Sequence, residues 1–229
     1  MNRGRAIAIA TVLLLAQSAF TWAGGRPDKE WKDWFGELSL DYSLAEGTFG
    51  DLFDDDLGVS GGAMYWPSDW NVGLGLSLGY AEFDVRNSVI DAFNAQLGPG
   101  DGSITGADLS TYTLMGDINW SPTGPDGIFY LTGGVGASYL DAKVTDDALV
   151  YYPPVCDPWF WWCYPGGVGP GTVVVNSRST TEFAWSAGVG LSYEVGEQGS
   201  QIFFEAKYQS VDTSRGGTAT IPVSIGYRW

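Results

Sequence analysis

The residues of this chain that could do chemistry are carboxylates, two cysteines and a few cations, and histidine is absent. Several acids occupy one face of segments in which large and small residues alternate: Glu37, Asp41, Asp117, Glu182, Glu194 and Glu205. Without histidine, a serine or water nucleophile would need an unconventional base, which leaves a glycosidase-type carboxylate pair as the alternative. The inward acids are explained more simply as charges that line an interior. We therefore expect a protein that is not an enzyme and that uses no cofactor or metal.

Charged residues on this same face predict a network of ion pairs instead. Lys207 and Arg228 lie near Glu205 and, if the last strand closes on the first, near Glu37. Charges withdrawn from water must be paired. The predicted lumen network consists of Glu37, Asp117, Glu194, Glu205, Lys207 and Arg228. Both a structural role and a gate for a narrow pore fit the sequence.

Two cysteines, Cys156 and Cys163, share the aromatic-rich segment PPVCDPWFWWCYPGG. Zinc would need more ligands than two cysteines without histidine. In an exported protein a disulfide is the better prediction. The residues within this ring include Trp159, Phe160, Trp161 and Trp162. They predict one of two things: a knob packed over the mouth of the β-barrel that is predicted below, or a recognition surface for a protein, a glycan or a lipid.

The segment WNVGLGLSLGY, residues 70–80, indicates which elements position these groups. Its large apolar residues alternate strictly with Gly, Ser and Asn, and aromatic residues stand at both ends. This pattern is typical of a strand that crosses a bilayer. Strands of this type are predicted over residues 34–44, 57–66, 70–80, 109–120, 128–140, 180–195, 201–210 and 218–229. The last strand is expected to place Trp229 outward, and the longest connections are expected as loops over residues 83–108 and 141–179.

Eight strands joined by alternating long and short connections predict an all-β fold, an eight-stranded antiparallel up-and-down transmembrane β-barrel. Residues 1–23 are predicted to be a signal peptide, with Arg3 and Arg5 before the apolar run 6–16. Residues 24–33 are then a short periplasmic lead-in, and residues 34–229 form the barrel domain. A net charge of −16 argues against a nucleic-acid partner.

These features resemble the small outer-membrane β-barrels of Gram-negative bacteria, the family of the OmpA transmembrane domain and the OmpW-like porins. The C-terminal segment IPVSIGYRW resembles that family's sorting signal through Ile225, Tyr227 and Trp229, although phenylalanine is the usual last residue. The resemblance implies an outer-membrane location, contact with outer-membrane lipids and lipopolysaccharide, and handling by the barrel-assembly machinery.

For function, we expect a structural or surface-interaction role. The long third extracellular loop, residues 141–179, is the expected contact element for a possible extracellular partner. The alternative is an OmpW-like or porin-like conduit for small solutes, and the sequence leaves both hypotheses open.

Overall fold

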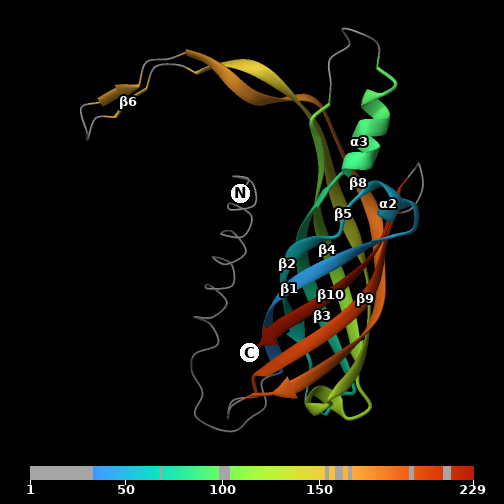
Figure 1. Cartoon of the computed structure of the whole chain (residues 1–229). Helices are drawn as coiled ribbons and strands as arrows, with labels where there is room; N and C mark the ends of the chain where they lie inside the picture. The colour runs from blue at the N-terminus through green and yellow to red at the C-terminus, as the bar shows by residue number, and fades with distance from the viewer. Residues whose placement is uncertain are drawn as a thin grey trace.

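The computed structural model confirms a closed eight-stranded antiparallel barrel (Figure 1). It describes residues 33–67, 69–97, 104–152, 155–157, 162–164, 167–195, 199–213 and 218–229. The barrel strands are β1 (Trp34–Glu46), β2 (Asp56–Tyr65), β3 (Val72–Asp84), β4 (Gly106–Trp120), β5 (Phe129–Tyr152), β8 (Gly167–Glu194), β9 (Gln201–Asp212) and β10 (Thr218–Arg228). Each strand pairs with the next one along the chain, and β10 pairs with β1. The predicted signal peptide and nearly all of the lead-in lie outside the described residues.

Alternation along each strand separates an outer face from an inner face, as the sequence pattern predicts. In β4 the side chains of Thr113, Met115 and Asp117 are buried, while Leu114 and Ile118 between and beyond them are exposed. A period of two follows from strand geometry, because successive side chains point to opposite faces. The apolar residues therefore form the surface that faces lipid, and the small polar residues line the interior.

Aromatic rings contact one another at two levels of this outer surface. At the end with long connections, the loop end, Tyr112 lies 4.9 Å from Tyr80 between ring centroids and 6.2 Å from Tyr139. At the opposite, turn end, Trp34 and Tyr65 lie 5.0 Å apart. Aromatic girdles at two levels are typical of barrels that cross a membrane.

The barrel closes between its two terminal strands. The β1–β10 pairing runs from Glu37 opposite Arg228 to Glu46 opposite Ala219. Beyond it, Gly36 and Trp229 exchange both backbone hydrogen bonds at 3.0 Å. The Trp229 ring stacks on Tyr227 and lies over Gly36, where a Cβ atom would come within 2.7 Å of the ring. Although Trp229 shares the outward face with Tyr227, these contacts leave it only 9% exposed.

The third long connection differs from the prediction. Residues 141–179 were expected to form a loop, but β5 and β8 remain paired from Asp141 opposite Ser179 to Tyr152 opposite Gly167. We call this extension of the β5–β8 pair, which β4 accompanies as far as Thr145, the β5–β8 ribbon (Figure 1). A run of Val173, Val174 and Val175 favours the strand conformation, and hairpin pairing satisfies its backbone groups. Beyond the ribbon, the short strands β6 (Val155–Asp157) and β7 (Trp162–Tyr164) pair antiparallel.

Short helices lie in the β1–β2, β3–β4 and β4–β5 connections. They are α2 (Gly47–Leu52) and α3 (Asn87–Asn94) at the loop end, and the 3-10 helix η1 (Gly124–Asp126) at the turn end. In the described part of the chain no helix is long and apolar enough to cross a membrane. The structural importance of α2 is that it carries Phe49, which is buried at the loop end of the barrel interior.

We predict that Leu76→Arg destabilises the folded barrel by about 2–4 kcal/mol in a bilayer, because it places a charge midway along the lipid-facing surface. Leu76 is 59% exposed, and the matched control, Val174→Arg, changes a residue of the ribbon that is 57% exposed. The control should change stability by less than about 0.5 kcal/mol. Reversible guanidinium unfolding in phospholipid vesicles measures both. Equal effects at the two positions would contradict the assigned lipid-facing surface.

Candidate functional site

The best-defined polar site in the barrel interior is built around Arg228 of β10, which is 2% exposed. Its Nη2 atom lies 3.2 Å from Oε2 of Glu37, and its Nη1 atom donates a 3.4 Å hydrogen bond to Gln201 Oε1. The guanidinium carbon lies 4.9 Å from the ring centroid of Phe203 and 5.5 Å from that of Tyr130. The barrel closure creates this arrangement, because it sets Glu37 directly opposite Arg228.

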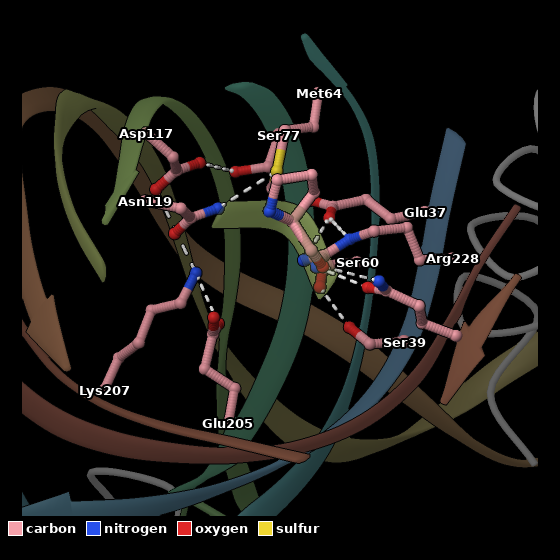
Figure 2. A network of polar contacts seen from close by, with 12 residues as sticks. Glu37, Ser39, Ser60, Met64, Ser77, Asp117, Asn119, Glu205, Lys207 and Arg228 are labelled. Atoms are coloured by element: carbon pink, nitrogen blue, oxygen red, sulfur yellow. Dashed lines mark hydrogen bonds and ion pairs between the residues drawn. The ribbon is translucent and has the colours of Figure 1, made fainter. Parts of the chain in front are cut away.

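Lys207 of β9 forms the second part of the site (Figure 2). Its Nζ atom lies 2.7 Å from Glu205 Oε1 and 3.9 Å from Asp117 Oδ1. The other carboxylate oxygen of Asp117 accepts a 2.5 Å hydrogen bond from Ser77 Oγ. The charged contacts thus join β10 to β1 and β9 to β4, and the hydrogen bond from Ser77 adds β3.

Apolar clusters lie on either side of this charged layer. The loop-end cluster consists of Phe49, Phe83, Leu109, Met115, Leu140, Ala184 and Val211. The turn-end cluster consists of Phe35, Met64, Trp66 and Tyr130. Since interiors of eight-stranded barrels are filled by side chains, the polar layer is enclosed between two packed apolar groups.

Two cavities flank the charged residues. A cavity of about 110 Å³ extends from the charged layer to the loop-end cluster, and its polar walls include Asp41, Ser43, Ser186 and Ser224. A smaller cavity of about 30 Å³ lies beside Arg228. A single water needs roughly 10–15 Å³ on this measure. The larger cavity therefore has room for several waters or a small solute.

Asp41 lines the larger cavity and is 8% exposed. Its Oδ1 atom accepts a 2.9 Å hydrogen bond from Ser39 Oγ, which lies 2.6 Å from Ser60 Oγ. No ion pair among the described residues includes Asp41. The sequence places this carboxylate inside the barrel, but it was not among the residues predicted for the charge network.

Glu194 does not belong to the network for which it was predicted. It is exposed at the turn end of β8, opposite Gln201. Alternation along β8 assigns Glu194 to the inner face, but Glu194 lies beyond Ser192, the last buried residue of that face. An exposed carboxylate needs no charged partner, because water can solvate it.

Those of the remaining predicted residues that the structure describes lie outside the barrel interior. Ile225 and Tyr227 lie on the outer face, 49% and 40% exposed. Cys156 of β6 stands opposite Cys163 of β7 in the strand register, and Trp162 belongs to β7. Trp159, Phe160 and Trp161 lie outside the described residues.

Two aromatic residues of the site, Tyr130 and Phe203, were missed as site residues in the sequence. Tyr130 stands on a face otherwise filled by Gly, Ser and Thr, and Phe203 on a face of Gln, Glu and Lys, and that contrast is the signal that could have revealed them. Their rings need small neighbours, because a Cβ atom at Gly190 would overlap Tyr130 and one at Gly226 would overlap Phe203. The inner glycines therefore make room for the side chains that surround Arg228.

A second acidic group lies on the outer face at the loop end. Asp84 and Asp108 face each other directly in the β3–β4 pairing, and Lys143 Nζ lies 2.9 Å from Asp141 Oδ2 nearby. Burial, followed by the charge of Glu82, raises the pKa of Asp108 above its usual value. Within the described residues, no group of three or more His, Cys, Asp or Glu side chains could hold a metal ion.

Comparison with known proteins gives a match to one family model, described as outer membrane protein beta-barrel domain, over residues 7–228. Among solved structures, Ail of Yersinia pestis in complex with the heparin analogue sucrose octasulfate is 17% identical, with a TM-score of 0.50, and the match covers 86% of this chain and 100% of that one. This likeness concerns the fold alone. A comparison with curated proteins gave no match.

Two further barrels are similar at lower scores. The N-terminal domain of Pseudomonas aeruginosa OprF is 11% identical, with a TM-score of 0.45 and coverage of 87% of this chain and 100% of that one. Neisserial surface protein A is 12% identical, with a TM-score of 0.45 and coverage of 86% and 96%.

We predict that Glu37→Gln destabilises the barrel by about 3–5 kcal/mol, because it leaves Arg228 buried without its charged partner. Adding Arg228→Met should recover most of this loss, since the double variant buries no unpaired charge. Glu182→Gln is the control, because Glu182 is part-buried and its carboxylate accepts a hydrogen bond from Thr180. Urea unfolding in detergent micelles measures all three. A Glu37→Gln loss no larger than the control's would show that the ion pair contributes little.

Proposed function

The chain belongs to the outer membrane protein β-barrel family and is a protein of the bacterial outer membrane; on that premise we propose that it is a non-enzymatic surface-interaction protein. In this proposal the loop end faces the cell exterior, and the β5–β8 ribbon carries the contact element. The barrel serves as the membrane anchor, in contact with outer-membrane lipids and lipopolysaccharide. Ile225, Tyr227 and Trp229 act earlier, as the signal read by the barrel-assembly machinery.

The length of the ribbon is the observation that carries this proposal. The twelve β5 residues 141–152 continue to pair with β8 beyond the girdle, although β4 pairs with β5 only as far as Thr145. At about 3.3 Å per residue the ribbon extends roughly 40 Å. Figure 1 shows it leaving the barrel and bending away from the barrel wall. An ordered projection of this length covers no part of the lipid-facing surface, which supports a role in contact with a partner.

The end of the ribbon has the composition of a contact site. The segment between Cys156 and Cys163 contains four successive aromatic residues, 159–162. Aromatic side chains are enriched among the residues that dominate binding energy at protein interfaces. A disulfide between the opposed cysteines would hold this hairpin in one shape and lower the entropy lost on binding.

Charge limits the class of partner. The structure of Ail contains a heparin analogue, which is a polyanion. The present chain has a net charge of −16, and of its exterior cations Lys143 is already paired with Asp141 and Arg86 with Asp54. We therefore propose a partner with a neutral or basic surface rather than a sulfated glycan, since like charges repel at an interface.

A conduit for small solutes is supported less well. The barrel interior does contain polar cavities, but apolar clusters lie at both ends of the charged layer. Steady conduction would require Arg228 and Lys207 to leave their carboxylate partners and at least one apolar cluster to open. The ribbon has no evident use in that function.

We predict that deleting residues 153–166 and joining Tyr152 to Gly167 through two glycines abolishes surface binding without unfolding the barrel. These two residues are already opposite each other, so the join should not disturb the ribbon. Binding is measured with vesicles that carry the protein, on arrays of glycans and extracellular proteins, against empty vesicles. The matched variant changes the four residues 159–162 to serine and should lose binding about tenfold or more, as expected when interface anchors are truncated.

Heat-modifiable gel migration checks that both variants still contain a folded barrel. Undiminished binding after the deletion would contradict the proposal. So would wild-type vesicles that bind nothing beyond the level of empty vesicles.

We also predict that Cys156 and Cys163 form a disulfide in the exported protein. Thiol alkylation after denaturation should modify neither cysteine until a reductant is added, as mass spectrometry would show. By the loop-closure model so small a ring stabilises the ordered hairpin by about 2–3 kcal/mol. Alkylation of both cysteines without reductant would refute the disulfide.

A further inference from the structure

The buried carboxylates of the barrel interior outnumber the cations. Among the described residues the interior acids near the charged layer are Glu37, Asp41, Asp117 and Glu205, and the interior cations are Lys207 and Arg228. All six side chains are at least three-quarters buried. The ion pairs described above therefore leave an excess of negative charge inside the membrane.

The contacts show where this excess lies. Arg228 is matched with Glu37, while Lys207 is shared between Glu205 and Asp117. Asp41 receives one hydroxyl hydrogen bond from Ser39 and forms no ion pair with any residue that the structure describes. An ionised carboxylate that is withdrawn from water without a cation costs several kcal/mol. A compensating charge is therefore expected beside Asp41.

The cavity of about 110 Å³ supplies the space for it. Asp41, Ser43 and Ser60 line this cavity together with Asp117 and Ser186. Independently of the charge count, Ser186 Oγ is buried and has no hydrogen-bond partner among the described residues, and Asp117 Oδ1 has none besides its 3.9 Å ion pair with Lys207; these residues are only 5% and 7% exposed. Buried polar atoms normally have a hydrogen-bond partner, so two oxygens without one in the wall of the same cavity indicate an occupant.

We propose that this cavity binds a small monovalent cation, with the Asp41 carboxylate as its charged ligand and cavity hydroxyls and water as the others. Carboxylate, hydroxyl and water oxygens are the ligands that hard cations prefer. A tightly held divalent ion would need several carboxylates at one point, and the described residues offer no such group. The cation could be sodium or potassium, or a protonated small amine whose carbon atoms contact the apolar loop-end cluster.

The test is the stability of the full-length exported protein in phospholipid vesicles, at constant ionic strength, in sodium, potassium, methylammonium or choline chloride. Choline is the large reference cation. We expect saturable stabilisation by at least one of the small cations, with the unfolding constant falling about tenfold when the cation exceeds its Kd tenfold. Sodium or potassium acting alone identifies an inorganic ion, whereas a stronger effect of methylammonium identifies an amine.

Asp41→Asn should remove this cation dependence and should be at least as stable as the wild type in choline. The matched control is Glu46→Gln, which changes an exposed carboxylate on the same strand and should keep the dependence. Equal stability in all four salts, or a cation effect that survives Asp41→Asn, would overturn the proposal. If Asp41→Asn does not fold, infrared spectroscopy of isotope-labelled wild-type protein decides, because a protonated Asp41 at neutral pH in sodium would overturn it as well.

Discussion

The structure depends on one constraint, which is that hydrocarbon offers no hydrogen-bond partners to the backbone. Each strand must pair on both sides, so the sheet has to close, and β10 meets β1 from Glu37–Arg228 to Glu46–Ala219. The same pairing creates the charged site, because it sets an acid and a base opposite each other on the inner face. The backbone requirement and the interior chemistry therefore have a common origin in the register of one strand pair.

The second consequence of closure is a narrow interior that has to be packed. Small residues on the inner face allow a few large ones, Tyr130, Phe203 and Arg228, to reach across it. Packing of this kind accounts for both features of the interior, since it encloses charges that need partners and confines the remaining space to small cavities. It also separates the two parts of the molecule, the filled barrel and the projecting ribbon; in the proposed function the barrel is the anchor and the ribbon makes the contact.

Much of the fold could be predicted because the decisive signal is local. A period of two can be read from any ten residues, and it correctly separates Leu76 on the lipid side from Asp117 inside. The opposition of Glu37 and Arg228 follows once closure is assumed. The ribbon was missed because the distance over which a hairpin stays paired depends on contacts between segments far apart in the chain. The exposure of Glu194 depends on where its strand leaves the packed interior. That Asp41 forms no ion pair with a described residue depends on which carboxylates Lys207 and Arg228 contact. Neither outcome can be predicted from the alternation of large and small residues.

Closure of the barrel by β1 and β10 in the stated register can be tested by cysteine crosslinking in the membrane. In a chain with both native cysteines changed to serine, Leu40→Cys and Ile225→Cys place thiols on opposed lipid-facing residues. We predict rapid crosslinking within one chain, and none for the pair Leu40→Cys and Ser224→Cys, whose side chains lie on opposite faces. Crosslinks that form only between chains, or equally well in both variants, would contradict a closed barrel with this register.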